Sequence, residues 1–358
     1  MTPNLLKMMI IMSHHWATAS QEEVAVFEDG PSPPLTRPAV PASMRQVALE
    51  ALQQPCQNTY DSDIQCHSFA AGGECARNPG WMHVFCAASC LACELMDSRV
   101  RCREETIASY PESVNYKRRA AMAAGGIDAL FAALPGSFPE YNISFLSSPP
   151  EGPWIAQFDD FIKPEEIDAL LSHATSLKRS TDQGGRTGAN GVQVQVTSTS
   201  RTSTNAWCIR ECAQDPLVQR VSDRIETVTG IPQVNYENFQ ILKYETGQRY
   251  RRHHDMSNSD NTKLSGPRIL TFFLYLSDVE AGGGTSFPDL TPKVTMMPKK
   301  GSAILWPSVM DDNPTRRDSR THHEALPVEE GLKYAANHWI HLYDYKSPNL
   351  WGCTGAFE

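Results

Sequence analysis

The sequence predicts a mainly β protein with supporting α-helices, in which a larger domain of the sandwich or jelly-roll kind follows a small disulfide-rich domain. Between Trp154 and Tyr345, short β-type runs separated by Gly and Pro turns follow two helical stretches. Six cysteines are crowded between Cys56 and Cys93. The length of 358 residues suits one large domain with smaller appendages.

Residues 1–55 have the composition of an export signal followed by a linker. In residues 1–20, Lys7 interrupts a short apolar run, and Ala17-Thr18-Ala19 is a candidate cleavage site for a secretory signal peptide. Residues 21–55 are acidic, then proline-rich, and end in a short helix predicted at Ser43–Gln54. No run approaches the roughly 20 apolar residues of a membrane-spanning helix.

The cysteine-rich segment from Cys56 to Cys93 is too short to build an adequate core, so it needs covalent support. Three disulfides would each contribute about 2–4 kcal/mol. Zinc is the alternative, because Cys90 and Cys93 have ligand-like spacing. We favour disulfides, since ten cysteines in the chain suit an oxidising compartment. Spacing alone leaves the pairing open.

Residues 94–153 form a connecting, partly helical segment. The alanine-rich stretch Tyr116–Leu134 predicts a helix that breaks at Gly125-Gly126. Asn142-Ile143-Ser144 is an N-glycosylation sequon, which has meaning only in a secreted chain.

Residues 154–345 carry the alternating pattern of the larger domain. Helices are predicted at Pro164–Ala174 and Asp215–Thr229, from apolar positions at helical spacing and from Pro164 and Gly230 at their ends. The predicted strands are Phe239–Leu242, Arg268–Leu276, Ala303–Trp306 and Ala335–Tyr343. Thr181–Val196 is glycine-rich and polar and is expected to be a loop. Residues 346–358 form a tail.

The stretch Tyr244–Asp255, YETGQRYRRHHD, holds the best candidate site. In a strand, His253 and Asp255 share one face, and together they supply two thirds of a 2-His-1-carboxylate Fe(II) site. His322 and His323 are the candidates for a third ligand from a later strand. Lys333 lies in a predicted buried strand, where its ammonium needs an anionic partner such as a bound oxo acid.

Charge and motif content argue against binding of nucleic acids or nucleotides. The net charge of −9 and pI near 5.7 do not suit a protein that neutralises phosphates. The run Gly282-Gly283-Gly284 lacks the Lys-Ser/Thr of a P-loop and lies between predicted strands.

The cysteine order, with Asp61, Gly73 and the closing CAASCLAC, resembles the ShKT domain. The resemblance implies the pairs Cys56–Cys93, Cys66–Cys86 and Cys75–Cys90. Because residues 56–93 contain no lysine, the channel-plugging lysine of the toxins in that family is absent. An accessory role that contacts protein or glycan is therefore expected. Cys102, Cys208, Cys212 and Cys353 remain unassigned, although Cys208 and Cys212 are close enough in sequence to pair.

Residues 154–345 resemble the prolyl 4-hydroxylases of the 2-oxoglutarate and Fe(II)-dependent dioxygenase superfamily. The matching blocks, in order, are RTS from Arg201, YxxGQxYxxHxD from Tyr244, RILTFFLYLSDVEAGGGTSFP, PKKGSAILW and HxxxPVxxGxKYxxNxW from His323. The resemblance implies a double-stranded β-helix, or jelly roll. It also implies iron binding by His253, Asp255 and His323, 2-oxoglutarate binding by Lys333, Tyr244 and Thr271, a wall at Trp339, and peptide binding by Arg201.

The same resemblance implies a prolyl 4-hydroxylase that uses Fe(II), 2-oxoglutarate, O2 and ascorbate to convert peptidyl proline to 4-hydroxyproline, releasing succinate and CO2. The expected compartment is the lumen of the endoplasmic reticulum or the outside of the cell. One alternative keeps the iron chemistry but changes the substrate to another peptide residue or a small molecule. Another is a non-catalytic ShKT-type binding protein.

Overall fold

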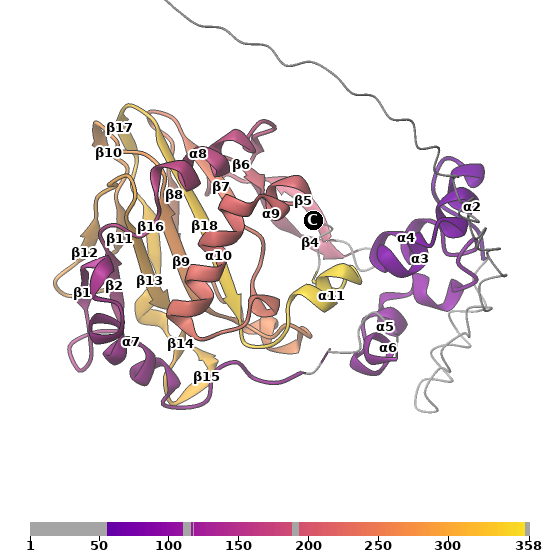
Figure 1. The fold of residues 1–358 in the computed structure, drawn as a ribbon, viewed down its shortest axis with the longest axis horizontal. Helices are drawn as coiled ribbons and strands as arrows, with labels where there is room; N and C mark the ends of the chain where they lie inside the picture. The colour runs from indigo at the N-terminus through magenta and orange to yellow at the C-terminus, as the bar shows by residue number, and fades with distance from the viewer. Residues whose placement is uncertain (1–55, 110–115, 117, 188–192, 355–358) are drawn as a thin grey trace, which may run out of the picture. The chain divides into compact units, whose positions relative to one another are not determined.

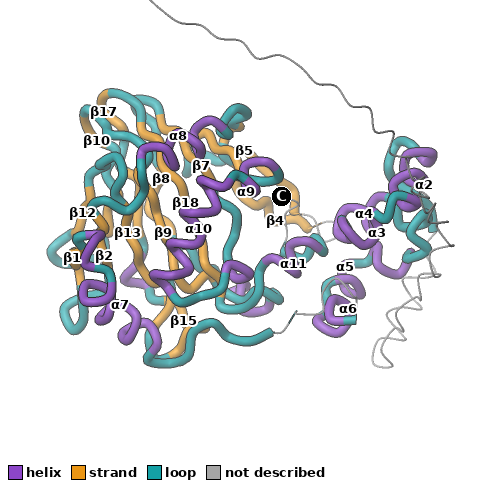
Figure 2. Tube along the Cα trace, in the orientation of Figure 1, coloured by secondary structure: helices purple, strands orange, loops and turns teal. Residues whose placement is uncertain are grey.

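The computed structural model describes residues 56–109, 116, 118–187 and 193–354, and it is rich in antiparallel strands. The predictions for residues 1–55, including the signal segment, the linker and the helix at Ser43–Gln54, lie outside the described residues. Figure 2 shows that strands dominate the part from β1 to β18, whereas residues 56–109 form short helices and loops. The mainly β fold with a small disulfide-rich region is confirmed.

An eight-stranded antiparallel sheet, the large sheet, forms the base of the larger domain (Figure 1). Its strands, in spatial order, are β1 (Ile143–Ser147), β2 (Ile155–Phe158), β13 (Ala303–Pro307), β9 (Arg268–Tyr275), β18 (Lys333–His341), β7 (Gln240–Tyr244), β6 (Thr204–Trp207) and β3 (Lys178–Arg179). The four predicted strands correspond to β7, β9, β13 and β18, with shifts of up to two residues at their ends.

A second, four-stranded sheet, the small sheet, carries the first part of the candidate site. Its strands, in order, are β12 (Val294–Met296), β11 (Thr285–Phe287), β16 (His323–Ala325) and β8 (Tyr250–His253). Three strand pairs complete the β structure: β10 (Ala281–Gly282) with β17 (Val328–Glu330), β14 (Val309–Met310) with β15 (Asn313–Arg317), and β4 (Thr181–Thr187) with β5 (Gln193–Thr197). The expectation of a loop at Thr181–Val196 is wrong for its two described ends, which pair with each other as β4 and β5, while residues 188–192 lie outside the described residues.

Helices cover the outer face of the large sheet (Figure 1). They are α7 (Gly126–Ser137), α8 (Pro164–Ser172), α9 (Glu211–Gln214) and α10 (Pro216–Thr229). The Asp215 side chain caps α10 by accepting from the amide of Leu217 at 2.8 Å, and Gly230 ends the helix at a φ of 66°. The local sequence thus sets the bounds of α10 as predicted.

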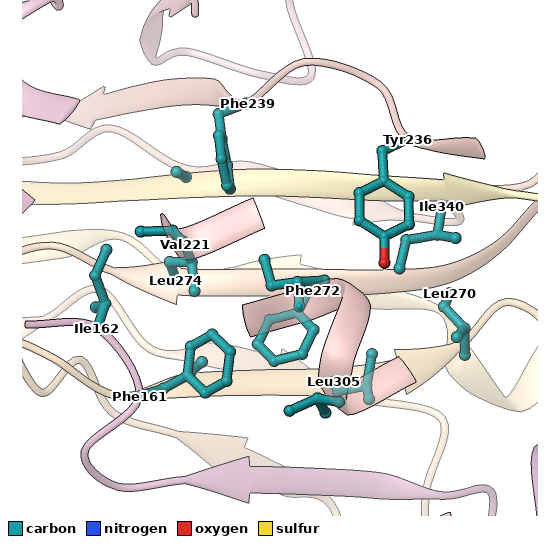
Figure 3. Close-up of a cluster of buried hydrophobic side chains, with 14 of the residues drawn as sticks. Phe161, Ile162, Val221, Tyr236, Phe239, Leu270, Phe272, Leu274, Leu305 and Ile340 are labelled. Atoms are coloured by element: carbon teal, nitrogen blue, oxygen red, sulfur yellow. The ribbon is translucent and has the colours of Figure 1, made fainter. Parts of the chain in front are cut away.

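The strand alternation divides the apolar side chains between two cores. Phe272 and Leu274 of β9 point to the helix-covered core, where Phe161, Val221 and Ile340 also lie (Figure 3). The intervening Phe273 and Tyr275 belong to the core shared with the small sheet. The members of that inner core are Ile155, Leu242, Tyr244, Phe273, Tyr275, Phe287, Met296, Ile304, Trp306, Val328 and Ala335. Two sheets that share an inner core form the predicted jelly roll.

The alanine-rich segment before Gly125 is not helical, and this part of the prediction for Tyr116–Leu134 is wrong. The amide of Ala121 donates to the carbonyl of Leu342 at 2.8 Å, and the amide of Gly125 donates to Asp311 at 3.0 Å. These tertiary backbone bonds replace the intrahelical bonds that local propensity favours. Only from Gly126 does the helix α7 form.

The cysteine-rich region contains α2 (Asp63–Ala71), α3 (Glu74–Arg77) and α4 (Pro79–Phe85), followed by α5 (Ser98–Arg101) and α6 (Glu104–Ala108). Its disulfides are Cys56–Cys93, Cys66–Cys86 and Cys75–Cys90, the same pairs that the ShKT resemblance implies. The remaining cysteines form Cys102–Cys353 and Cys208–Cys212. All ten cysteines are therefore paired, which leaves none for zinc.

The C-terminal segment packs against residues that follow the six crowded cysteines. After α11 (Lys346–Leu350), the buried Trp351 lies in an apolar cluster with Leu95, Val100 and Ile107. The buried Arg101 guanidinium donates to the carbonyl oxygens of Trp351 at 3.0 Å and of Leu95 at 2.7 Å. The segment expected to be a tail thus packs against residues 95–107, at the start of the connecting segment, and is tied to it by the Cys102–Cys353 disulfide.

Short 3-10 turns connect several of these elements. They are η2 (Cys93–Met96), η4 (Pro139–Tyr141), η5 (Gln233–Asn235), η6 (Asn258–Thr262) and η7 (Ser319–Thr321). In the described part of the chain, no helix has both the length and the apolar character needed to cross a membrane.

Candidate active site

His253, Asp255 and His323 come together where β8 and β16 pair in the small sheet. His253 and His323 are directly opposed cross-strand partners, and Asp255 follows two residues after His253. Asp255 Oδ1 lies 3.8 Å from His253 Nε2, and its Oδ2 lies 3.6 Å from His323 Nε2. One ligand atom from each residue lies within 4.8 Å of the others, so the three side chains could hold a metal ion.

Backbone carbonyls fix the tautomers of both histidines. His253 Nδ1 donates to the carbonyl of Arg251 at 2.9 Å, and His323 Nδ1 donates to that of Thr321 at 3.0 Å. Since a carbonyl oxygen can only accept, each Nδ1 carries the proton and each Nε2 presents a lone pair. The orientation of both imidazoles is the one that metal-binding histidines adopt.

The electrostatics favour an ionised Asp255 carboxylate beside a neutral His253 imidazole. Burial alone would raise the pKa of Asp255, but His323 and His253 outweigh it and hold that pKa well below its usual range. Burial, followed by the neighbouring His323, lowers the pKa of His253 well below its ordinary value. A divalent iron site requires deprotonated ligands, and these shifts favour that state at Asp255 and His253.

The two neighbouring histidines face other groups. His254 donates through Nε2 to the carbonyl of Asp318 at 2.9 Å, and its Nδ1 accepts from the amide of Met256 at 3.0 Å. His322 donates through Nδ1 to the carbonyl of Ser319 at 2.7 Å. Neither belongs to the cluster of His253, Asp255 and His323.

Thr271 touches a member of this cluster. It lies on β9, and its hydroxyl donates to Asp255 Oδ2 at 2.6 Å. The hydrogen bond orients the carboxylate and links the small sheet to the large one. The contact of Thr271 with the co-substrate, which the family resemblance implies, stays a prediction beside this observed contact with Asp255.

We expect Thr271→Val to weaken metal retention about 10–100-fold, since it removes this orienting bond at nearly constant volume. Competition of the loaded protein with a chelator measures the effect. Thr204→Val is the matched control, because Thr204 pairs with Lys243 on the outer face of the large sheet. Equal metal affinity in the Thr271 variant and the wild type would show that the bond has no such role.

Lys333 begins β18 and is completely buried on the inner face of the large sheet, opposite Tyr244. Its ammonium donates to the carbonyl of Gly283 at 2.6 Å and lies 5.3–5.5 Å from the ring centroids of Tyr244, Phe273 and Tyr275. Among the described residues, this carbonyl and these rings are its only charge-stabilising contacts, and burial lowers the pKa of Lys333 to about 7. A buried amine without a carboxylate is suited to an incoming anion.

The glycine run supplies the carbonyl that Lys333 uses. Gly282 and Gly283 have φ values of 75° and 69°, in the left-handed region that favours glycine. A Cβ at Gly282 would lie 2.5 Å from the carbonyl oxygen of Pro327. The run is therefore a tight turn between β10 and β11, in agreement with its expected position between strands.

Arg201 and Trp339 are both buried near the cluster of His253, Asp255 and His323. Arg201 forms a β-bridge with Tyr250, stacks over its ring at 5.1 Å, and is close enough to His253 to lower the pKa of that histidine. Its Nη2 donates to Gln240 Oε1 at 2.6 Å. Trp339 lies opposite Thr271 on β18, and in the described part of the chain its Nε1 has no hydrogen-bond partner.

A polar triad behind Trp339, made of buried Glu237 and His341 and half-buried Arg268, is absent from the sequence prediction. Arg268 lies over the Trp339 ring at 3.8 Å, and its Nε donates to Glu237 Oε1 at 2.5 Å. His341 Nε2 donates to the same Glu237 oxygen at 2.8 Å. Arg268 also helps to hold the pKa of Asp255 low. The sequence does hold a signal for this triad, because Arg268 and His341 stand in otherwise apolar strands, where polar side chains require partners.

Comparisons with known proteins place these residues in one family. Residues 239–341 match the model of the 2OG-Fe(II) oxygenase superfamily. Prolyl 4-hydroxylase subunit alpha-2 of Gallus gallus is 35% identical over 195 residues, which cover 53% of this chain and 34% of that protein. The chain thus spans about a third of the length of such curated alpha subunits.

Shorter relatives are matched over more of their length. The probable prolyl 4-hydroxylase 8 of Arabidopsis thaliana is 32% identical over 207 residues, which cover 52% of this chain and 68% of that protein. Among solved structures, the viral collagen prolyl hydroxylase from Paramecium Bursaria Chlorella virus-1 is 26% identical over 52% of this chain and 95% of its own, with a TM-score of 0.41. Because two thirds of the Arabidopsis thaliana relative is covered above 30% identity, the chain belongs to the prolyl 4-hydroxylase family of the 2OG-Fe(II) oxygenase superfamily.

Proposed function

We propose that this protein is an Fe(II)- and 2-oxoglutarate-dependent prolyl 4-hydroxylase, which converts peptidyl proline to 4-hydroxyproline and releases succinate and CO2. One observation carries the proposal. His253, Asp255 and His323 cluster within 4.8 Å on the small sheet, while Lys333 lies buried on the large sheet without a carboxylate partner among the described residues.

The residues of the cluster fit iron. Two neutral imidazoles and one carboxylate match the donor set of non-haem Fe(II) oxygenases and leave three of six coordination positions for other groups. When bound there, iron supplies the activation of O2 and the oxidation of both substrates. The contribution of His253, Asp255 and His323 is to hold and orient it.

Lys333 and Tyr244 would bind the distal carboxylate of 2-oxoglutarate. The two residues are cross-strand neighbours in the inner core, where aromatic side chains exclude water. Because Lys333 is surrounded by aromatic rings, a carboxylate would gain a strong, charge-assisted hydrogen bond there. Thr271 would assist indirectly by keeping the Asp255 carboxylate in place.

Arg201 and Trp339 would position the peptide. Gln240 holds the Arg201 guanidinium, and the Arg268 guanidinium lies over the Trp339 ring, so both side chains are fixed before a substrate arrives. The alpha-subunit relatives support a proline-containing peptide as the substrate class.

The remaining parts of the chain would support the enzyme. We assign residues 154–345 to the dioxygenase domain, residues 56–93 to a ShKT-like accessory domain that contacts protein or glycan, and residues 94–153 to the connection between them. Five disulfides support the secretory pathway, with the endoplasmic reticulum lumen or the outside of the cell as its location. Ascorbate would return oxidised iron to its active state.

A peptide panel tests this function. The full chain is incubated with Fe(II), 2-oxoglutarate and ascorbate, together with collagen-like or extensin-like peptides or copies in which alanine replaces proline. We expect succinate release and the mass of one added oxygen on proline, with the added oxygen absent from the alanine copies. An added oxygen on another residue, or none with any proline-rich peptide, would contradict the proposal.

A further inference from the structure

The N-glycosylation sequon Asn142-Ile143-Ser144 lies at an exposed turn that leads into an edge strand. Asn142 follows η4 with φ 44° and ψ 61°, and both Asn142 and Ser144 are exposed. β1 starts at Ile143 and occupies the end of the large sheet, where it pairs with β2 alone (Figure 1). A bulky group on Asn142 would therefore meet solvent rather than the core.

No other asparagine in the chain lies in a usable sequon. Asn313-Pro314-Thr315 has the right outer residues, but proline in the middle position excludes it from glycosylation. Asn313 is nevertheless exposed, on β15. The sequence thus offers one acceptor together with a built-in negative control.

The covalent chemistry of the chain points to the compartment in which N-glycans are added. All ten cysteines are paired, and one of the five disulfides joins residues 251 positions apart. Disulfides of this kind form in the oxidising secretory pathway and are rare in the cytosol. This observation is independent of the sequon and of the proposed hydroxylase activity.

We propose that Asn142 carries an N-linked glycan. In the transfer, a bond forms between Asn142 Nδ2 and C1 of the first sugar of a lipid-linked oligosaccharide. The bond from that C1 to the lipid diphosphate breaks, the diphosphate leaves with the bonding electrons, and Nδ2 releases one proton to a base. No oxidant or reductant is needed.

The local contacts accommodate the modified side chain. Asn142 Nδ2 donates to Asp159 Oδ2 at 2.8 Å, and Asp159 lies just after β2. A glycosylated Nδ2 keeps one N–H, so it retains a proton to donate to Asp159. The glycan would stand at one end of the open edge of β1, where bulk opposes pairing with a strand of another molecule.

The test is peptide mass spectrometry on the full chain, expressed behind a cleavable secretion signal in eukaryotic cells. Trypsin, which does not cut the Lys163-Pro164 bond, releases residues 120–178, in which Asn142 is the only asparagine. We expect this peptide to carry a glycan that peptide-N-glycosidase removes in ¹⁸O-water, leaving a labelled aspartate at position 142. The Asn313 peptide should stay unmodified.

Two substitutions separate the sequon from other modifications. Asn142→Gln and Ser144→Ala should each remove the glycan, and Pro314→Ala should create a second acceptor at Asn313. Recovery of residues 120–178 only in unmodified form, while the Pro314→Ala chain is glycosylated at Asn313, would overturn the proposal. None of these residues lies in the proposed active site, so 2-oxoglutarate turnover provides a separate check on folding.

Discussion

Replacing His253 by alanine is expected to abolish 2-oxoglutarate turnover and to empty the metal site. The imidazole supplies one of three ligand atoms that lie within 4.8 Å of one another, and no other described residue can replace it. Loss of a residue that merely orients a ligand costs about 10–100-fold, so loss of the ligand itself should cost more than about a hundredfold. Succinate release and the iron content of the loaded protein measure the two effects.

The chain offers a matched control for each histidine ligand. His254→Ala removes the next residue, whose bonds go to Asp318 and Met256, and should leave most of the turnover and the iron content intact. His323→Ala and His322→Ala form the second pair, because His322 bonds to Ser319. Equal loss of turnover and iron content in His254→Ala and His253→Ala would contradict the assignment of His253 as the metal ligand.

Replacing Lys333 by methionine is expected to weaken 2-oxoglutarate binding by about thirtyfold to a thousandfold, that is, by roughly 2–4 kcal/mol. The change removes a buried ammonium that would meet the distal carboxylate of the co-substrate. Methionine has a similar volume and needs no solvation, so the free energy of unfolding should hold or rise. Calorimetric titration of the metal-loaded protein measures the affinity, and thermal melting checks the fold.

Lys243→Met is the control for charge, since that residue adjoins Tyr244 but pairs with Glu245 at the surface. It should bind 2-oxoglutarate like the wild type. Unchanged affinity in Lys333→Met would remove Lys333 from the co-substrate site.

The pH dependence of binding follows from the same lysine. Burial lowers the pKa of Lys333 to about 7 in the free protein, and carboxylate binding requires the ammonium form. Below pH 7 the ammonium is already present, so affinity should be flat. Above pH 7 each pH unit should cost about 1.4 kcal/mol of binding free energy, or a factor of about ten in affinity, up to the higher pKa that Lys333 has beside the bound carboxylate. The same titration in Lys333→Met should lack this slope.

Local signals in the sequence predict much of the fold. Gly230 and the capping Asp215 set the bounds of α10, and the apolar runs that start near Arg268 and Lys333 become central strands. The secondary-structure predictions that fail are those in which backbone hydrogen bonds to other segments replace local ones. Ala121 gives its amide to Leu342 rather than to a helix, and the polar segment at Thr181 finds a strand partner in β5.

The metal cluster is predictable because strand alternation brings His253 and Asp255 to one face. The family resemblance selects His323 over His322, and the cross-strand register with His253 gives the structural reason. Patterns of side chains do not predict contacts of the backbone, so the hydrogen bond from Lys333 to the Gly283 carbonyl could not be predicted from the sequence. The Thr271 bond to Asp255 also depends on how the two sheets face each other.

Disulfide connectivity is also not predictable from local sequence patterns. Spacing alone allows many pairings of the six crowded cysteines, and only the ShKT resemblance selects the three that form. The bond between Cys102 and Cys353 spans 251 residues and joins segments that no local pattern connects. The packing of Trp351 against Arg101 and its neighbours brings these two segments together.

Isotopic labelling of the oxygen tests the central claim most directly. The full chain, Fe(II), ascorbate and unlabelled 2-oxoglutarate react with a proline-rich peptide under ¹⁸O₂, and mass spectrometry locates the label. The account predicts one labelled atom in succinate and one in a hydroxyl group at C4 of proline, in equal amounts. Labelled succinate with no labelled proline across the panel would contradict it.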